Sequence, residues 1–67
     1  MTGSELAAIR KSLGLSTTQW GRALGYSGTD ASVSASVRRL EARHDDAIPT
    51  TVGRLALMYD RYGVPRE

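Results

Sequence analysis

Two neighbouring segments decide the fold of this chain: Leu13–Gly25, which reads LGLSTTQWGRALG, and Ser34–Glu41, which reads SASVRRLE. In the first, a serine precedes a short run that closes on Leu-Gly, and this order predicts a helix with a capped start and a glycine end. The second predicts another helix, with small and basic residues beside an apolar stripe. We therefore expect an all-α protein, a compact bundle of four or five short helices in which residues 16–42 form two helices joined by a turn.

The first helix of the chain is expected to begin at Glu5, with Ser4 as its cap, because the serine hydroxyl can accept from an unpaired first-turn amide. Glu5 also favours the positive end of the helix dipole. Gly14 is expected to end this helix, since glycine adopts a positive φ after the last turn without a steric cost. The apolar face consists of Leu6, Ile9 and Leu13.

The second helix is expected over residues 17–24, with Ser16 as its cap. A helix of only about eight residues is held by packing rather than by intrinsic propensity, and Trp20 and Leu24 would supply that packing as core residues. Gly21 costs about 1 kcal/mol relative to alanine inside a helix. Its presence predicts a place where another helix comes close.

Residues 26–31 form a turn-rich connector, after which Asp30 or Ser32 is expected to cap the third helix. The buried stripe of that helix is expected to consist of Val33, Val37 and Leu40.

The fourth helix is expected to have Pro49 in its first turn, to run to about Tyr62, and to be ended by Gly63 and Pro65. Its broad apolar face would consist of Val52, Leu55, Ala56, Met58, Tyr59 and Tyr62.

Length and composition narrow the class of protein. A chain of 67 residues makes one domain, near the lower limit for a core without disulfides, metal or a partner chain, so dimerisation is expected. Without cysteine, and with one histidine, neither a disulfide framework nor a zinc site is expected. No nucleophile with a histidine–carboxylate pair and no glycine-rich phosphate loop is present, so we expect neither an enzyme nor a cofactor. No apolar run approaches the roughly 20 residues that span a bilayer, and the amino terminus lacks a signal-peptide layout, which predicts a cytoplasmic protein with no membrane partner.

The distribution of charged residues along the chain says more about function than the net charge does. The net charge of +2 is by itself a weak argument for nucleic acid. However, Arg38, Arg39 and Arg43 fall within six positions, at and just after the end of the third helix. Small residues together with arginines on one helix face are typical of a helix that lies in the major groove of DNA, although a solvated charged face is the alternative.

At this point the sequence resembles the Cro-like, or xenobiotic-response-element, family of helix-turn-helix transcription regulators, with a lambda-repressor-like fold. The resemblance covers Leu6 to about Met58. It rests on the Leu-Gly-Leu-Ser entry at 13–16, the Leu24-Gly25 helix end, the Val37-x-x-Leu40-Glu41 signature and the Ile48-Pro49 helix start. Small stand-alone regulators of this kind resemble those of phages and mobile elements, including anti-CRISPR-associated autorepressors, and also antitoxins.

The resemblance implies a set of DNA-binding residues. Thr17 stands where the family has a phosphate-anchoring glutamine. Ser34, Ala35 and Arg39 stand where side chains point at base edges, and Arg39 is the strongest candidate because a guanidinium can bond both O6 and N7 of guanine. Arg38 and Arg43 stand where phosphates are contacted. The full expected set is Thr17, Thr18, Ser32, Ser34, Ala35, Ser36, Arg38, Arg39, Arg43 and His44.

Two further assignments follow from the resemblance. Arg10 in the first helix and Glu41 at the end of the third are expected to form a structural ion pair rather than to bind DNA. Tyr59, Tyr62 and Val64 are expected either at the edge of the core or, as we favour, at a dimer surface.

The sequence departs from the family pattern in two places. The segment between Gly25 and Ser34 is about six residues longer than the usual tight turn, so the third helix either starts earlier or lies at a different angle. The chain also ends after four expected helices where many relatives have five, which leaves the dimer contact to the fourth helix and the tail.

These observations favour a sequence-specific repressor, an autorepressor that binds an inverted repeat of double-stranded DNA as a homodimer and has no evident small-molecule ligand. Binding would associate it with the nucleoid. The alternative is an antitoxin-type or helical protein-interaction module that uses the same fold.

Overall fold

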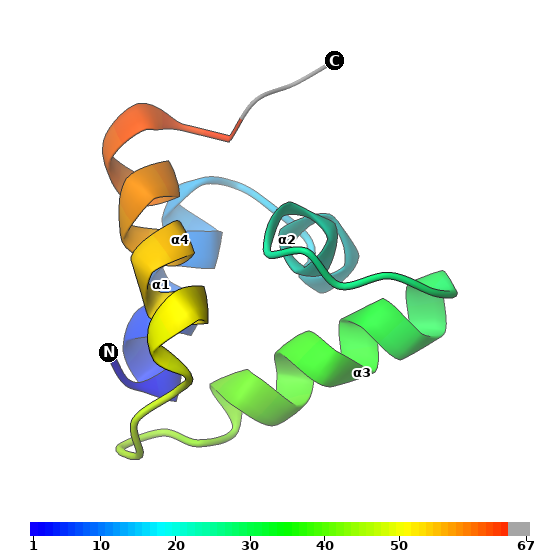
Figure 1. Cartoon of the computed structure of the whole chain (residues 1–67), viewed down its shortest axis with the longest axis horizontal. Coiled ribbons are helices and arrows are strands. Elements are labelled where there is room, and N and C mark those ends of the chain that lie inside the picture. Colours follow the sequence, from blue (N-terminus) through cyan, green and yellow to red (C-terminus); the bar gives the residue numbers. More distant parts are fainter. Residues whose placement is uncertain (65–67) are drawn as a thin grey trace.

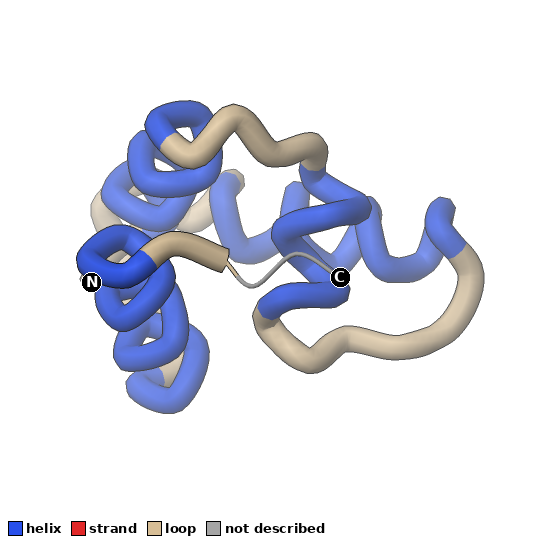
Figure 2. The backbone as a smooth tube through the Cα atoms, turned by 90° about the horizontal axis from the view of Figure 1, so that it is seen from above, coloured by secondary structure: helices blue, strands red, loops and turns tan. Residues whose placement is uncertain are grey.

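A computed structural model of the chain describes residues 1–64, and within this range the chain forms four helices and no strand. They are α1 (Gly3–Ser12), α2 (Thr17–Ala23), α3 (Asp30–Glu41) and α4 (Thr50–Tyr62). In Figure 1, α1 and α4 lie side by side, α2 is seen nearly end-on, and α3 runs along one edge of the molecule below it. Figure 2 shows the same helices from above, with the loops that join them in tan. The expectation of an all-helical chain is confirmed.

The first two helices begin with reciprocal caps. The Thr2 hydroxyl accepts from the Glu5 amide while the Glu5 carboxylate accepts from the Thr2 amide, so α1 starts at Gly3. Our assignment of Ser4 as the cap is therefore wrong, and the threonine three residues before Glu5 was the signal for the true cap. The cap of α2 is Ser16, as expected, and the Gln19 side chain completes the pair in the same way.

The start of α3 differs from the expectation in its cap. The Thr29 hydroxyl accepts from the Ser32 amide at 3.2 Å, so neither Asp30 nor Ser32 is the cap. The helix begins at Asp30, four residues before Ser34. Of the two explanations offered for the long connector, an earlier start is confirmed.

Glycines end three of the helices, as their positions predicted. Gly14 and Gly25 adopt φ values of 72° and 95°, and the amides around each bond back to carbonyls of the last turn, which are thereby satisfied. Gly63 closes α4 with a φ of 81°. Pro49 stands immediately before α4 rather than in its first turn, and Pro65 lies outside the described residues.

The core joins all four helices around Trp20. Its indole is fully buried and meets the Tyr59 ring edge-on, with ring centroids 5.9 Å apart. The Tyr59 hydroxyl donates to the Ala23 carbonyl at 2.8 Å, which fastens α4 to the end of α2. The expected stripe of α3 is buried, and the main core residues are Leu6, Trp20, Leu24, Val33, Val37, Leu40, Ile48, Val52 and Ala56.

Gly21 is the place where α2 and α3 come closest. A Cβ built there would lie 2.4 Å from Val33 Cγ1 and 2.9 Å from Val37 Cγ2, so no larger side chain is accommodated without a shift of α3. The predicted close approach is confirmed. It lets the short α2 bury its tryptophan while α3 passes directly across it.

The N-terminus of α1 holds the loop that follows α3. The amides of Gly3 and Ser4 donate to the carbonyls of Arg43 and His44, at 3.1 and 3.2 Å. A Cβ on Gly3 would lie 2.4 Å from the Leu40 carbonyl oxygen, so this packing also requires glycine. The backbone just after α3 is thereby fixed.

Arg10 and Glu41 form the expected ion pair between α1 and α3. The two side chains are 17% and 13% exposed, and two nitrogens of the guanidinium donate to the two carboxylate oxygens, at 2.8 and 3.3 Å. The third nitrogen donates to the Leu15 carbonyl at 3.1 Å. One arginine therefore links α1, α3 and the turn before α2.

Candidate nucleic-acid interface

One face of α3 is covered by no other described part of the chain. Opposite the buried stripe, the exposed residues recur at helical spacing: Ala31, Ser32, Ala35, Arg38, Arg39 and Ala42. The middle of this face carries only the methyl group of Ala35, and the two guanidiniums stand near its C-terminal end. We call these six residues the α3 face.

The two neighbouring arginines of the α3 face turn to opposite flanks. Arg38 Nη2 donates to Ser34 Oγ at 3.1 Å, whereas Arg39 Nη2 donates over a longer distance, 3.5 Å, to Ser36 Oγ. At about 100° per residue, Ser34 and Ser36 lie on opposite sides of Ala35. Arg38 therefore leans toward α2, and Arg39 leans away from it.

Ser34 lies at the contact with α2 rather than on the α3 face. It is 8% exposed, and its hydroxyl lies 2.6 Å from the Thr17 hydroxyl while it accepts from Arg38. Because it faces α2 and its hydroxyl is already bonded to two side chains, Ser34 offers little exposed surface to a base edge. Thr17, half-buried at the first position of α2, is engaged by the same contact.

The remaining expected DNA-binding residues are accessible in differing degrees. Ala35 and Ser32 are exposed on the α3 face, whereas Thr18 and Ser36 are half-buried. The Ser36 hydroxyl donates to the Ser32 carbonyl at 3.1 Å, so it is already used within α3. Arg43 is exposed, and its backbone carbonyl is tied to α1.

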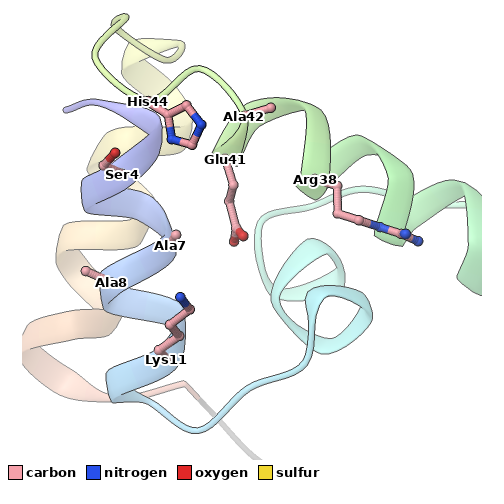
Figure 3. Close-up of a pocket in the computed structure, with 8 residues that line it drawn as sticks. All are labelled: Ser4, Ala7, Ala8, Lys11, Arg38, Glu41, Ala42 and His44. Carbon is pink, nitrogen blue, oxygen red and sulfur yellow. The ribbon is translucent and has the colours of Figure 1, made fainter.

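His44 stands at one end of an open groove between α1 and the end of α3, and Lys11 stands at the other (Figure 3). The Glu41 carboxylate lies between them, with its charge met by Arg10, and the Arg38 side chain runs away from α1. Lys11 was not among the expected DNA-binding residues. It reaches the groove because α1 packs beside α3. The groove is lined by Ser4, Ala7, Ala8, Lys11, Arg38, Glu41, Ala42 and His44.

The connector before α3 is braced by a second ion pair that the sequence did not suggest. Arg22 Nη2 bonds the Asp30 carboxylate at 2.5 Å and the Gly28 carbonyl at 3.3 Å. The pair joins the end of α2 to the start of α3. It also places a cation beside the one carboxylate in the first turn of α3.

The charge around the α3 face is mainly positive. Arg38, Arg39 and Arg43 are exposed at or just beyond its end, whereas Glu41 is paired. The exposed Asp45 and Asp46 follow in the next loop. Among the residues that the structure describes, no group of three or more histidine or acidic side chains is arranged to hold a metal ion.

The residues expected at a dimer surface differ in their exposure. Tyr59 is committed to Trp20 and to the Ala23 carbonyl, and Val64 packs against the core, so these two lie at the core edge. Tyr62 is 76% exposed, and Leu57 and Met58 are 56% and 44% exposed on the same helix. The free apolar surface of α4 therefore includes two residues that the sequence prediction had not placed there.

Comparisons of the chain with protein-family models, curated proteins and solved structures found no match. Within residues 1–64, no helix combines the length and the apolar character needed to cross a membrane.

Proposed function

We propose that this chain is a sequence-specific DNA-binding transcription regulator of the Cro-like type, in which α2 and α3 form a helix-turn-helix and α3 lies in the major groove. The observation that carries the proposal is the α3 face, an uncovered helix surface with two arginines and an otherwise small-residue crest.

The dimensions and chemistry of this face suit a major groove. A helix of 12 residues is about 18 Å long, and the groove, about 12 Å wide, admits one helix. Ala31, Ala35 and Ala42 let the helix backbone approach the base edges closely, and Ala35 is placed to meet a thymine methyl group. Longer side chains along the crest would hold the helix away from the bases.

The two arginines are assigned different tasks. The side-chain hydrogen bond of Arg39 to Ser36 is long, at 3.5 Å, and is easily broken. The guanidinium is then free to donate to O6 and N7 of a guanine. Arg38 is held toward α2, at the flank of α3, where the sugar-phosphate backbone bordering the groove would lie. Arg43, just after the helix, is assigned to a second phosphate.

We further propose that the protein acts as a homodimer and represses by occupying an inverted repeat, with autoregulation as the simplest control. Leu57, Met58 and Tyr62 form an exposed apolar surface on α4, and a second copy covering it would relate two α3 faces by a two-fold axis. Half-sites about 34 Å apart would then be read in successive major grooves. The same α4 surface favours the second candidate, an antitoxin-type or other protein-interaction module, in which the partner is a different protein.

The test is a titration of labelled duplex DNA at several salt concentrations with the wild-type protein and three single variants. If the dimer meets about six to eight phosphates, log affinity should fall against log salt with a slope of roughly −5 to −7. Arg38→Ala should make the slope shallower by about one unit per protomer and weaken all sequences alike, because a phosphate contact is lost. Arg39→Ala should cost about 1 to 3 kcal/mol on the preferred sequence and little on others.

Arg54→Ala is the matched control, since Arg54 is exposed on α4 rather than on the α3 face. Its slope and affinity should stay at wild-type values. If Arg38→Ala and Arg39→Ala also bind DNA like the wild type, α3 is not the recognition helix. That result would favour the interaction-module candidate.

A further inference from the structure

We propose that Thr17 and Ser34 act as positioning residues for Arg38: their paired hydroxyls hold its guanidinium on the α2 flank of α3 and thereby raise affinity for duplex DNA. This inference rests on the proposed function. It starts from Ser34, a polar side chain in a largely apolar helix–helix contact.

Ser34 is buried between α3 and the start of α2, where its hydroxyl meets the Thr17 hydroxyl. A buried hydroxyl costs free energy unless it is hydrogen-bonded. Ser34 meets this requirement twice, through Thr17 at 2.6 Å and through Arg38 at 3.1 Å. The three side chains form a chain of hydrogen bonds that runs from the exposed guanidinium of α3 to the first residue of α2.

The direction of the bonds follows from the donor inventory. Arginine only donates, so the Ser34 oxygen must accept from Arg38. Ser34 then has its own hydrogen to give, and Thr17 Oγ1, 2.6 Å away, is the acceptor that uses it. A hydroxyl that accepts from a cation is a stronger donor, so the two bonds reinforce each other. With the bonds in this direction, the Thr17 hydrogen takes no part in the bond to Ser34.

The consequence for binding is preorganisation. A mobile arginine side chain loses conformational entropy when it binds DNA. When Ser34 holds the guanidinium in the unbound protein, part of that entropy is already lost before binding, so the entropic cost of binding is smaller. Arg39 offers the internal comparison, because its own bond to Ser36 is longer, at 3.5 Å, and the Ser36 hydroxyl also donates to the helix backbone. Two adjacent arginines on one helix are therefore predicted to differ, one held and one mobile.

The first measurement needs no DNA. Nitrogen-15 relaxation of the arginine Nε–H groups in the wild-type protein should show Arg38 more ordered than Arg39. Ser34→Ala should bring the order of Arg38 down to that of Arg39. Equal mobility of the two arginines in the wild type would overturn the proposal, whatever the protein binds.

The second measurement is a double-mutant cycle on DNA affinity with a labelled duplex of about 30 base pairs, long enough for two half-sites one helical turn apart. Ser34→Ala should weaken binding about 3- to 10-fold, the range expected for one lost hydrogen bond, in the wild-type background. In the Arg38→Ala background it should change nothing, because the residue it positions is gone. A purely structural role of Ser34 predicts equal losses in both backgrounds and would contradict the proposal.

Two variants serve as controls for this interpretation. Ser34→Cys keeps a small side chain with a poor hydrogen-bonding group and should weaken DNA binding as Ser34→Ala does. Thermal unfolding of both variants shows whether either has a packing defect. Thr17→Ser retains the hydroxyl and should bind like the wild type. If wild-type protein binds no duplex, the proposed function fails together with the affinity half of this inference, while the relaxation data still decide whether Arg38 is held.

Discussion

At the scale of single residues, the most consequential contact for the fold is that of Arg10. Its guanidinium is bonded to both Glu41 oxygens and to the Leu15 carbonyl, and both charged partners are mostly buried. Removing one member leaves a partly buried charge and a carbonyl without their partner, which costs far more than an exposed ion pair contributes. Arg10→Ala should therefore lower the free energy of unfolding by about 3 kcal/mol.

The control for that prediction is Arg22→Ala. Arg22 and Asp30 are 47% and 78% exposed, so the loss of this pair should cost less than about 1 kcal/mol. Urea unfolding followed by circular dichroism measures both. An Arg10→Ala protein as stable as the wild type but weak in DNA binding would show that Arg10 is a DNA ligand rather than a scaffold residue.

At the scale of helices, what the sequence revealed and what it did not can be separated physically. Apolar spacing correctly indicated the Val33 stripe, and glycines after the last turns marked where helices end. Caps were assigned less well, because several hydroxyls stand near each start and only the reciprocal bond of Thr2 with Glu5 distinguishes the cap of α1 from its neighbour Ser4.

The candidate interface shows the same division. The sequence placed Ala35 and Arg39 on an exposed face, but the inward turn of Ser34 depends on the angle at which α2 crosses α3. Lys11 likewise reaches the groove only through the packing of α1 beside α3. Contacts of this kind form between helices, so the spacing of residues within one helix does not predict them.

The crossing of α2 and α3 is tested by a pair of glycine substitutions. Gly21→Ala places a Cβ 2.4 Å from Val33 Cγ1, so the cost of overpacking should exceed the gain in helix propensity and destabilise the fold by about 1 to 2 kcal/mol. Gly53→Ala in α4 meets nothing nearer than Met1 Cβ at 3.5 Å and should stabilise by about 0.5 to 1 kcal/mol. Melting temperatures that move in the same direction for both would contradict the close approach at Gly21.

At the scale of the whole molecule, the α3 face and the exposed apolar surface of α4 are two surfaces of different character on different helices. The α3 face is basic and small, whereas Leu57, Met58 and Tyr62 on α4 are large and apolar. A symmetric pair joined through α4 would present two α3 faces to one duplex. This arrangement predicts that the preferred DNA sequence has two-fold symmetry, because the two copies would read the same half-site in opposite directions.

Selection from a pool of random duplex DNA with the purified protein at near-physiological salt tests the central claim most directly. We predict enrichment of an inverted repeat whose half-sites lie about one helical turn apart, with a guanine whose preference is lost in Arg39→Ala. A folded wild-type protein that enriches no sequence would contradict the claim that α3 is a DNA recognition helix.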